Sequence, residues 1–588
     1  MSNNPILYLW KKAWQFSKGN RPQVVLFIAF FIVANIIALL QPLIVAKILS
    51  TVQEQGITKE NFHSFLFLIS LFILQTIAFW MFHGPARVIE TRNAFLVRAN
   101  YKQYLLRGTL SLPMAWHTDH HSGDTIDKIE KGSRALFDFS ENGFQIIQAT
   151  VRFIGSIVAL ALFSFNTLFV ILFTTIIAIR IIIRFDRAIV PKYRELNSAE
   201  NKISAKIYDG ISNISTVIIL RAESLLESDI AKSIRRPFEL FVHTTKLNEW
   251  KWFMASIASS ATSFFVLGLY AFSTLRSGEA ILIGTLYALY SYTDRINDIF
   301  YTFAYLYSDT VRWRTSLENA EELSKQFKKQ SSGKQHELHH WRTCSISGLH
   351  FSYHGKKSED LHLDNVSMSI LRGEKIAVIG ESGSGKTTFL KILRGLYAPS
   401  AVSVSLDGHR LTKGFQSMQD DIALIPQDPE IFATTIRENI TMGIDRTDDE
   451  IMSYARLARF SQVINRLPHG LNSSIVEKGV NLSGGEKQRL ALARGLMASE
   501  DKSIILLDES TSSVDAHNEA LIYEAIFSAY TDKTIIASIH RLHLLRMFDT
   551  IYLFDQGKII GSGTFDKLLE SSPLFSEMWT KYSKTKRK

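Results

Sequence analysis

Long apolar stretches are concentrated in the first half of the chain. Six of them occur before residue 300: Val24–Leu49, Phe62–Phe82, Phe144–Phe165, Leu168–Ile183, Phe253–Phe272 and Ala280–Tyr292. A helix needs about 20 apolar residues to cross the roughly 30 Å hydrocarbon core of a bilayer. The fourth and sixth runs are shorter than this and must extend into their polar flanks. The pattern therefore predicts six membrane helices.

The loops between these runs alternate in basic content. Eight Lys or Arg residues lie from Arg87 to Arg134, and twelve lie from Arg184 to Lys251. The other three loops contain only Lys59 and Arg276. Because cytoplasmic loops of membrane proteins are rich in Lys and Arg, the two long loops and both termini are predicted to be cytoplasmic. The helical periodicity of both long loops indicates that the helices continue beyond the membrane.

The segment before the first run alternates apolar and basic residues. Leu7, Trp10 and Trp14 are interleaved with Lys11 and Lys12. This pattern is typical of an amphipathic helix at a membrane interface, which we assign to residues 1–20. A frayed basic terminus is the alternative reading. We expect no accessory domain ahead of the first span.

The overall charge and the cysteine content narrow the function classes. The 588 residues carry a net charge of +10, which would suit a nucleic-acid-binding protein. The basic residues lie in loops next to the apolar runs, so we expect membrane topology to account for them and no nucleic-acid partner. A single cysteine, Cys344, excludes an internal disulfide framework.

The second half of the chain contains a phosphate-binding motif in the required setting. The apolar strand at residues 375–379 is followed by Gly380-Glu-Ser-Gly-Ser-Gly-Lys-Thr387 and then by an apolar-periodic helix at residues 389–396. Glycines let backbone N–H groups surround a phosphate, and the helix N-terminus favours the anion. Lys386 is predicted to neutralise phosphate oxygens, and the Thr387 hydroxyl to ligate Mg²⁺.

A second apolar strand, residues 504–507, ends in two acidic residues. Asp508 is predicted to hold Mg²⁺, directly or through water. The adjacent Glu509 is predicted to polarise an attacking water as a general base. On its own, an apolar strand that ends in two acidic residues is weak evidence for such a site. It becomes strong evidence here because the phosphate loop precedes it in the chain.

A third motif resembles one that is typical of a known protein family. The stretch Leu482-Ser-Gly-Gly-Glu486-Lys-Gln-Arg resembles the signature of ATP-binding-cassette (ABC) proteins. Two positions depart from the usual pattern. Glu486 stands where Gln is common, and the later stretch Ser512-Ser-Val-Asp515 stands where Ser-Ala-Leu-Asp is common. Both changes spare the groups assigned to phosphate contact, so we expect little loss of function.

The resemblance implies roles for residues outside these motifs. Tyr353 is expected to stack on adenine, and Glu477 to contact loops of a partner subunit. The set implied for ATP binding is Tyr353, Gly380, Glu381, Ser382, Gly383, Ser384, Gly385, Lys386, Thr387, Thr388, Ser483, Gly484, Gly485 and Asp515. The implied catalytic residues are Glu509, His540 and Gln427, and the implied Mg²⁺ ligands are Thr387, Gln427 and Asp508.

The membrane half extends the resemblance to ABC exporters. Residues 112–124 and 208–217, in the two long loops, resemble the coupling regions of such exporters. The expected fold is multidomain, with an all-α six-helix transmembrane domain followed by an α/β P-loop ATPase domain. The expected boundaries are an interfacial helix at 1–20, the transmembrane domain at 21–318, a linker at 319–343 and the ABC domain at 344–588.

The resemblance also implies partners and an activity. The expected function is ATP-driven export or flipping of an amphipathic substrate, such as a lipid, drug or peptide, across a lipid bilayer. No catalytic position is degenerate, which favours a homodimer over pairing with a related half-transporter. The alternative is an ATP-gated channel or transport regulator on the same scaffold. A bacterial inner membrane, with the N-terminus and the ATPase domain cytoplasmic, is the predicted location.

Charged residues within the apolar runs suggest a substrate site. Arg152 and Arg180 both lie about 20 Å below the predicted outer face, counted at 1.5 Å per helical residue. Asp294 and Arg295 lie at a similar depth in the sixth run. Our hypothesis is that Arg152 and Arg180 line the cavity that receives an amphipathic, anionic substrate, and whether Asp294 also lines it is left open. Snorkelling to the cytoplasmic interface, or a structural pair with Asp294, is the alternative.

Overall fold

The computed structural model describes residues 4–327, 341–353, 361–475 and 482–585. The chain divides into two units. The first consists of Met1–Leu112 and His120–Lys328, and the second of Pro113–Asp119 and Lys329–Lys588. Glu477 and much of the predicted linker lie outside the described residues.

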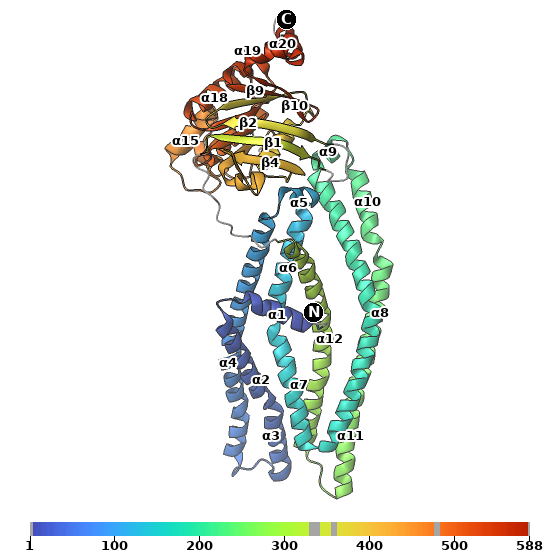
Figure 1. Ribbon diagram of the computed structural model, residues 1–588. Helices are drawn as coiled ribbons and strands as arrows, with labels where there is room; N and C mark the ends of the chain where they lie inside the picture. Colours follow the sequence, from blue (N-terminus) through green and yellow to red (C-terminus); the bar gives the residue numbers. More distant parts are fainter. Residues whose placement is uncertain (1–3, 328–340, 354–360, 476–481, 586–588) are drawn as a thin grey trace. The chain divides into compact units, whose positions relative to one another are not determined.

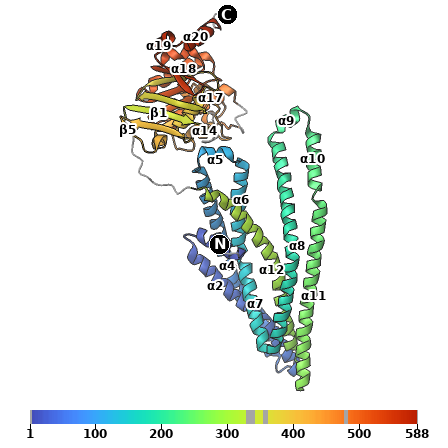
Figure 2. The same ribbon diagram turned by 45° about the vertical axis from the view of Figure 1, so that its right-hand side comes forward.

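The first unit is built from helices (Figure 1). They are α1 (Pro5–Phe16), α2 (Arg21–Leu39), α3 (Gln41–Gln55), α4 (Phe62–Leu110), α6 (Ser122–Glu141), α7 (Gly143–Phe163), α8 (Phe165–Ser212), α9 (Ile214–Ile219), α10 (Glu223–Arg235), α11 (Phe238–Ser277) and α12 (Ile283–Lys325). Several continue far beyond the length of a bilayer crossing, as the periodicity of the long loops predicts. Figures 1 and 2 both show α8 and α11 running side by side.

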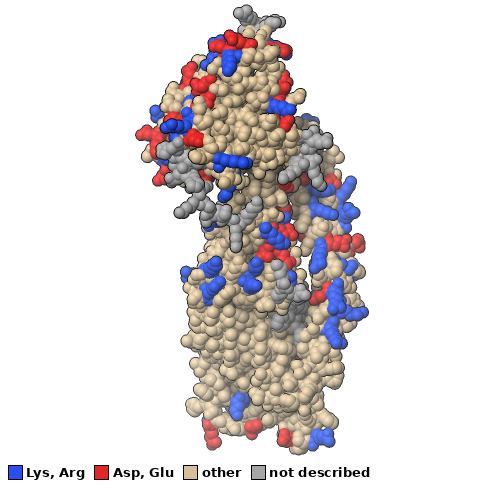
Figure 3. Space-filling view, viewed as in Figure 1, with Lys and Arg blue, Asp and Glu red and all other residues tan. Residues whose placement is uncertain are grey.

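Among the described residues of this unit, five stretches are long and apolar enough to cross a membrane: Arg21–Gln55, Phe62–Leu110, Ser122–Phe163, Phe165–Ser212 and Glu223–Ser277. The sixth predicted span lies in α12, which fails the apolarity criterion because Asp294, Arg295 and Asp298 interrupt its apolar residues. On the face drawn in Figure 3, a broad area of the first unit is almost uncharged. The predicted fold class, a helical membrane domain followed by an α/β domain, is confirmed.

The first predicted span is not one continuous helix. Pro42 has no N–H, so the carbonyl of Ala38 lacks its helical donor, and the chain breaks at Leu40 between α2 and α3. Helix α12 supplies the missing donors. The Tyr292 hydroxyl donates to the Leu39 carbonyl at 2.7 Å, and the Arg295 guanidinium donates to the Ala38 carbonyl at 3.0 Å. A break that would expose polar backbone to lipid is therefore satisfied inside the protein.

The amphipathic N-terminal segment forms α1, which packs on other helices of the first unit. Leu9 and Ala13 are buried, and the Tyr8 hydroxyl donates to the Glu321 carboxylate of α12 at 2.6 Å. Lys12 forms an ion pair with the same carboxylate. These contacts order α1, while its place at a membrane interface stays a prediction. Helix α12 runs to Lys325, beyond the predicted domain boundary at residue 318.

Two sheets organise the second unit. The antiparallel sheet has the order β2 (Leu363–Leu371), β1 (Thr343–Phe351), β4 (Ala401–Leu406) and β5 (His409–Arg410). The larger sheet has the order β10 (Lys558–Gly563), β9 (Thr550–Asp555), β3 (Lys375–Ile379), β8 (Thr534–Ser538), β7 (Ile504–Asp508) and β6 (Ile422–Ile425). Strands β9, β3, β8, β7 and β6 pair in parallel. Their carboxyl ends therefore share one edge of the sheet.

The second unit also contains helices. They are α5 (Met114–Asp119), α13 (Lys386–Leu393), α14 (Ile436–Thr441), α15 (Asp448–Leu457), α16 (Ser461–Arg466), α17 (Gly484–Ala498), α18 (Ala516–Ala529), α19 (Phe565–Ser571) and α20 (Pro573–Thr585). Strands β3, β7 and β8 are buried along their whole length. Such strands are typical of a parallel sheet covered on both faces.

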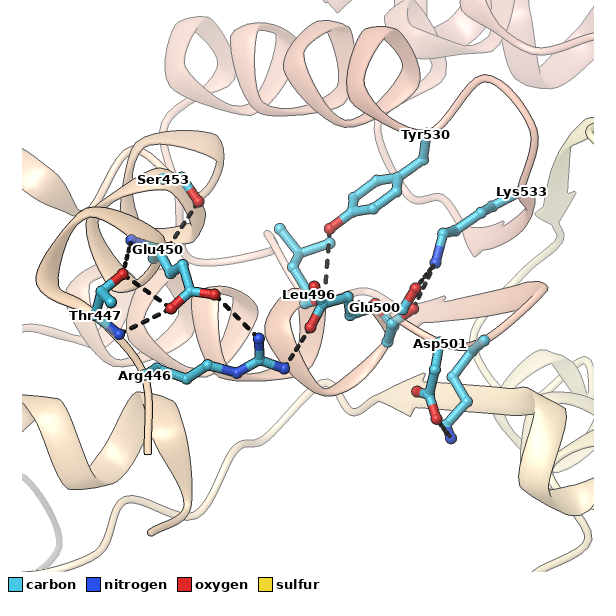
Figure 4. Close-up of polar contacts among 11 residues, drawn as sticks. Arg446, Thr447, Glu450, Ser453, Leu496, Glu500, Asp501, Tyr530 and Lys533 are labelled. Carbon is cyan, nitrogen blue, oxygen red and sulfur yellow. Dashed lines mark hydrogen bonds and ion pairs between the residues drawn. The ribbon is translucent and has the colours of Figure 1, made fainter. Parts of the chain in front are cut away.

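A lysine caps the carboxyl end of α17, the helix that begins at the signature motif. The Lys533 ammonium donates to the carbonyls of Ser499 and Glu500, at 2.7 and 2.5 Å (Figure 4). Arg446 bridges the Glu500 and Glu450 carboxylates on the other side. Positive groups at a helix C-terminus satisfy its last carbonyls and complement its dipole.

Replacing Lys533 by Met is expected to destabilise the α/β unit by about 2 kcal/mol, because a buried carbonyl and a partly buried carbonyl lose a charged donor. For a domain of this size the apparent unfolding midpoint should fall by roughly 4–8 °C. Thermal unfolding of the full-length protein in detergent measures this. Lys413→Met, at an exposed position, is the control, and equal midpoints for both variants would contradict the assignment.

Candidate nucleotide site

The phosphate loop connects β3 to α13 and depends on its glycines. Gly383 and Gly385 have φ values of 84° and 105°, a region that side chains disfavour. A Cβ atom on Gly385 would lie 2.8 Å from the Leu363 side chain. No side chain caps the N-terminus of α13. Its first N–H groups and its dipole are therefore available to an anion.

A cavity of about 530 Å³ opens beside this loop. It is lined by Leu361, His362, Ser382, Gly383, Gly385, Lys386, Thr387, Thr388, Gln427, Glu509, His540, Gln556 and Gly557. The volume lies in the range of small-molecule and cofactor pockets, about 300–1,000 Å³. The structure thus brings the loop together with the predicted catalytic residues.

Lys386 is buried at the base of the cavity. Its ammonium donates to the carbonyls of Gly380 and Glu381, both at 2.9 Å. Burial lowers the pKa of Lys386, and the nearby carboxylates of Glu509 and Asp508 act in the opposite direction. The cation is thus positioned where a phosphate would exchange its carbonyl partners for charged oxygens.

Thr387 and Asp508 form the polar pair that fits Mg²⁺. The Thr387 hydroxyl donates to a carboxylate oxygen of Asp508 at 2.9 Å. Asp508 is buried at the end of β7, and this burial raises the pKa of its carboxyl group. Hydroxyl and carboxylate oxygens are ligands that Mg²⁺ prefers. Gln427, also predicted as a ligand, hydrogen-bonds to Glu509 instead.

Glu509 is held at both of its carboxylate oxygens. The Gln427 side-chain amide donates to one oxygen at 2.9 Å, and the His540 imidazole lies 2.7 Å from the other. The backbone of Glu509 has a φ of 45°, an uncommon conformation for this residue type. Strained residues persist only when their surroundings hold them in place. The carboxylate is therefore fixed at the wall of the cavity.

Tyr353 lies beside the cavity and is not among the residues that line it. Its hydroxyl is 3.4 Å from the Thr388 hydroxyl, which does line the cavity. The ring meets Phe351, His362 and Tyr397 edge-on, and the side chain is 41% exposed. An aromatic face next to the phosphate loop has the geometry for stacking on a base.

The signature residues do not reach this cavity. Ser483 caps the N-terminus of α17, where its hydroxyl accepts from the N–H of Glu486 at 3.3 Å. Gly485 packs closely on the 512–515 loop, since a Cβ atom there would lie 2.8 Å from the Ser513 carbonyl oxygen. Asp515 is exposed and caps α18. Ser483, Gly484, Gly485 and Asp515 are all absent from the lining of the described cavity.

Some residues of the site were missed by the sequence analysis. Gln488 links two loops, because its side-chain amide donates to the Gln427 carbonyl and the Ser512 hydroxyl, and accepts from the Ser513 N–H. It lies two residues after Glu486, so the signature motif contained the signal. His362 and Gln556 also line the cavity. They come from distant segments and carry no motif.

Both units contain a region that matches the model of a known protein family. Residues 24–296 match the model of the ABC transporter transmembrane region, and residues 363–512 match the model described as ABC transporter. The chain belongs to the ABC transporter family. Both matched regions occur in this one sequence, each once.

Two relatives are similar to this chain in sequence. "ATP-binding cassette sub-family B member 6" of Mesocricetus auratus is 29% identical over 80% of this ABC transporter chain. The chain spans little more than half of that protein, 56% of its length. "Mitochondrial potassium channel ATP-binding subunit" of Mus musculus is 36% identical over 40% of the chain and 33% of its own length.

The fold comparison covers more of the chain. The structure described as a bacterial Atm1-family ABC exporter with ATP bound has a TM-score of 0.82 and 21% sequence identity. The match covers 95% of this chain and 99% of that one. At this identity the comparison supports the exporter fold alone.

The unusual Glu486 of the ABC signature has a local structural role. Its carboxylate accepts from the Ser483 N–H at 2.9 Å, which completes a capping box, and it pairs with the exposed Arg466. Gln also completes such a box, and an ion pair with an exposed Arg contributes little.

We therefore expect Glu486→Gln to shift the unfolding midpoint of the ABC domain by less than about 2 °C, since the change in stability stays within about 0.5 kcal/mol. Glu486→Ala should lower the midpoint by roughly 2–4 °C, because the cap, worth about 1 kcal/mol, is lost. Differential scanning fluorimetry of the full-length transporter compares the two. Equal losses in both variants would show that the negative charge matters.

Proposed function

We propose that this chain is the subunit of an ATP-driven exporter or flippase of amphipathic substrates. The observation that carries the proposal is the fixed carboxylate of Glu509, held by Gln427 and His540 beside a phosphate-binding loop. A base in this position accepts a proton from an attacking water. Family membership connects this chemistry to a membrane domain.

Each residue of the cavity has a task in the proposed reaction. The loop N–H groups and Lys386 bind the β- and γ-phosphates, and Tyr353 stacks on adenine. Thr387 and Asp508 would hold Mg²⁺, which neutralises charge on the phosphates when it is bound. Glu509 accepts the proton of the attacking water, and His540 orients the Glu509 carboxylate. Gln427 connects this carboxylate, through Gln488, to the signature helix.

The proposal includes a dimer with composite sites. Ser483, Gly484 and Gly485 lie at a helix N-terminus whose positive end suits a γ-phosphate, yet they do not line the cavity of their own chain. A second copy would supply them to the ATP held by the first. Since no catalytic position is degenerate, we favour a homodimer over a pair with a related half-transporter.

The membrane in which the transporter works is part of the proposal. The chain is a multi-pass membrane protein, and its basic loops support a cytoplasmic location for its termini and its ABC domain. The mouse relative is named as mitochondrial and the solved exporter as bacterial. We retain a bacterial inner membrane as the prediction, although the relatives compared by sequence are eukaryotic.

A second candidate is an ATP-gated channel or transport regulator. The 36% identity with the mouse potassium channel subunit favours it, over 239 residues. Binding or hydrolysis of ATP in the same cavity would then open or close the channel. Single-channel currents from the purified protein in a planar bilayer, at rates far above ATP turnover, would support this candidate over the exporter.

Glu509→Gln is expected to lower ATP hydrolysis at least a hundredfold, because the variant lacks the general base. ATP binding should persist, since the phosphate loop is unchanged. Phosphate release from the full-length protein in lipid nanodiscs measures the effect, and Glu524→Gln, at an exposed position of α18, is the matched control. A Glu509→Gln protein with more than a tenth of wild-type activity, or a wild type that binds ATP without hydrolysing it, would contradict the proposal.

A further inference from the structure

Arg152 lies near the middle of α7 in a predicted membrane span. The Nε atom of its guanidinium is fully buried and has no hydrogen-bond partner among the described residues. No carboxylate in the described part of the chain lies within 4 Å of it, the limit for an ion pair. An arginine in such a place is costly unless a polar group compensates it, so its presence indicates a function.

The charged groups nearest to Arg152 come from α12. Arg295 and Asp298 both interact with it electrostatically, and Asp294 in turn acts on Asp298. Arg295 is committed to the break between α2 and α3, where it also contacts the Gln41 side chain at 3.2 Å. Asp298 is exposed and stands beyond ion-pairing distance. The junction of α2, α7 and α12 therefore carries two cations that no described carboxylate neutralises directly.

Neutral polar atoms with no partner surround the same junction. Ser156, one turn after Arg152, has a buried hydroxyl without a described hydrogen bond. Between them, Gly155 packs directly on Leu39 of α2. One turn before Leu39, Asn35 is 1% exposed and its side-chain oxygen has no described partner, although its amide donates to the Phe31 carbonyl.

A histidine from α4 completes the group. The Nδ1 atom of His83 is buried without a described hydrogen bond, and Arg152 is within its electrostatic range. The His83 ring contacts Phe31 with centroids 5.5 Å apart, which places it beside the Asn35 turn of α2. Buried polar atoms are nearly always hydrogen-bonded in proteins. Unsatisfied atoms gathered from three helices thus indicate a missing polar ligand.

We propose that Arg152, Ser156, Asn35 and His83 form a subsite that binds the carboxylate or phosphate of the transported substrate. This inference rests on the exporter function proposed above and names the substrate class. The guanidinium and the Ser156 hydroxyl donate to the anion. The free oxygen of Asn35 accepts from a neighbouring hydroxyl or amide N–H of the ligand. The substrate class is therefore an anionic amphipath with a hydrogen-bond donor beside its charge.

The assignment revises the hypothesis made from the sequence. Arg180 on α8 and Asp294 on α12 are both exposed, and among the described residues neither forms a hydrogen bond or an ion pair with Arg152. Arg295 is occupied by the Ala38 carbonyl and the Gln41 side chain. The remaining competing account is structural, in which Arg152 serves only to balance Asp298.

Equilibrium binding to the nucleotide-free, full-length protein in phosphatidylcholine nanodiscs tests the subsite. The probes are N-dodecanoylglycine, which has a carboxylate next to an amide N–H, and its uncharged methyl ester, with empty nanodiscs as the blank. Wild type should bind the acid at least tenfold more tightly than the ester. Arg152→Ala should remove this preference and leave ester binding unchanged. Arg152→Lys should keep most of it.

The controls separate the competing accounts. Arg180→Ala should keep the wild-type preference, and Asp298→Asn should keep or increase it. Equal binding of acid and ester by wild type, an unchanged preference in Arg152→Ala, or a loss that occurs only in Arg180→Ala would overturn the subsite. A preference lost equally in Arg152→Ala and Asp298→Asn would support the structural account and would also overturn it. The assay needs no ATP hydrolysis, so an inactive ATPase, which would defeat the exporter proposal, leaves this result readable.

Discussion

The parallel pairing of β3, β8 and β7 is the constraint on which the ATP site depends. In-register pairing, with Val378 and Asp508 both opposite Ser538, brings the carboxyl ends of these strands to one edge of the sheet. The phosphate loop, Glu509 and His540 each follow one of these strands, and Asp508 is the last residue of β7. Residues more than 120 positions apart in the sequence, such as Thr387 and Asp508, thereby come within hydrogen-bond distance. Open parallel sheets bind ligands at this edge for the same reason.

A second constraint concerns the signature residues, which do not line the cavity at this edge of the sheet. Ser483 and the glycines after it lie at the start of α17, away from the cavity, while Gln488 on the same helix contacts the Gln427 and Ser513 segments. A change at the cavity can thus reach the signature helix through Gln488. In the proposed dimer, the signature residues of a second ABC domain would complete the site, and Gln488 would connect the two sites.

The sequence predicts those parts of the molecule whose residues are contiguous. The phosphate loop, the strand ending in Asp508 and Glu509, and the signature each lie in one short motif. Gln427 and His540 were assigned through family resemblance, because the contact with Glu509 depends on the order of strands in the sheet. His362 and Gln556 were missed for the same reason. The break at Leu40 was also missed, since an apolar run shows no change in pattern where Pro42 removes a hydrogen bond.

In the membrane domain, prediction from the sequence is limited for a different reason. Helices that are apolar on all sides carry no periodicity, so the sequence does not reveal which face points inward. Depth along a helix is readable by counting residues, and Arg152, Arg180 and Asp294 were grouped by depth alone. The structure separates them by direction: Arg152 is partly buried next to unsatisfied polar atoms, and the other two are exposed.

The central claim is that each ATP is hydrolysed between the phosphate loop of one chain and the signature of another. Mixed dimers test it most directly, made from one chain with Lys386→Met and a differently tagged chain with Ser483→Arg, and isolated by both tags. In composite sites, one of the two sites of the mixed dimer is fully wild type, so it should hydrolyse ATP while both parent homodimers do not. Inactive mixed dimers that still bind ATP would show that each chain needs its own signature, and would contradict the account.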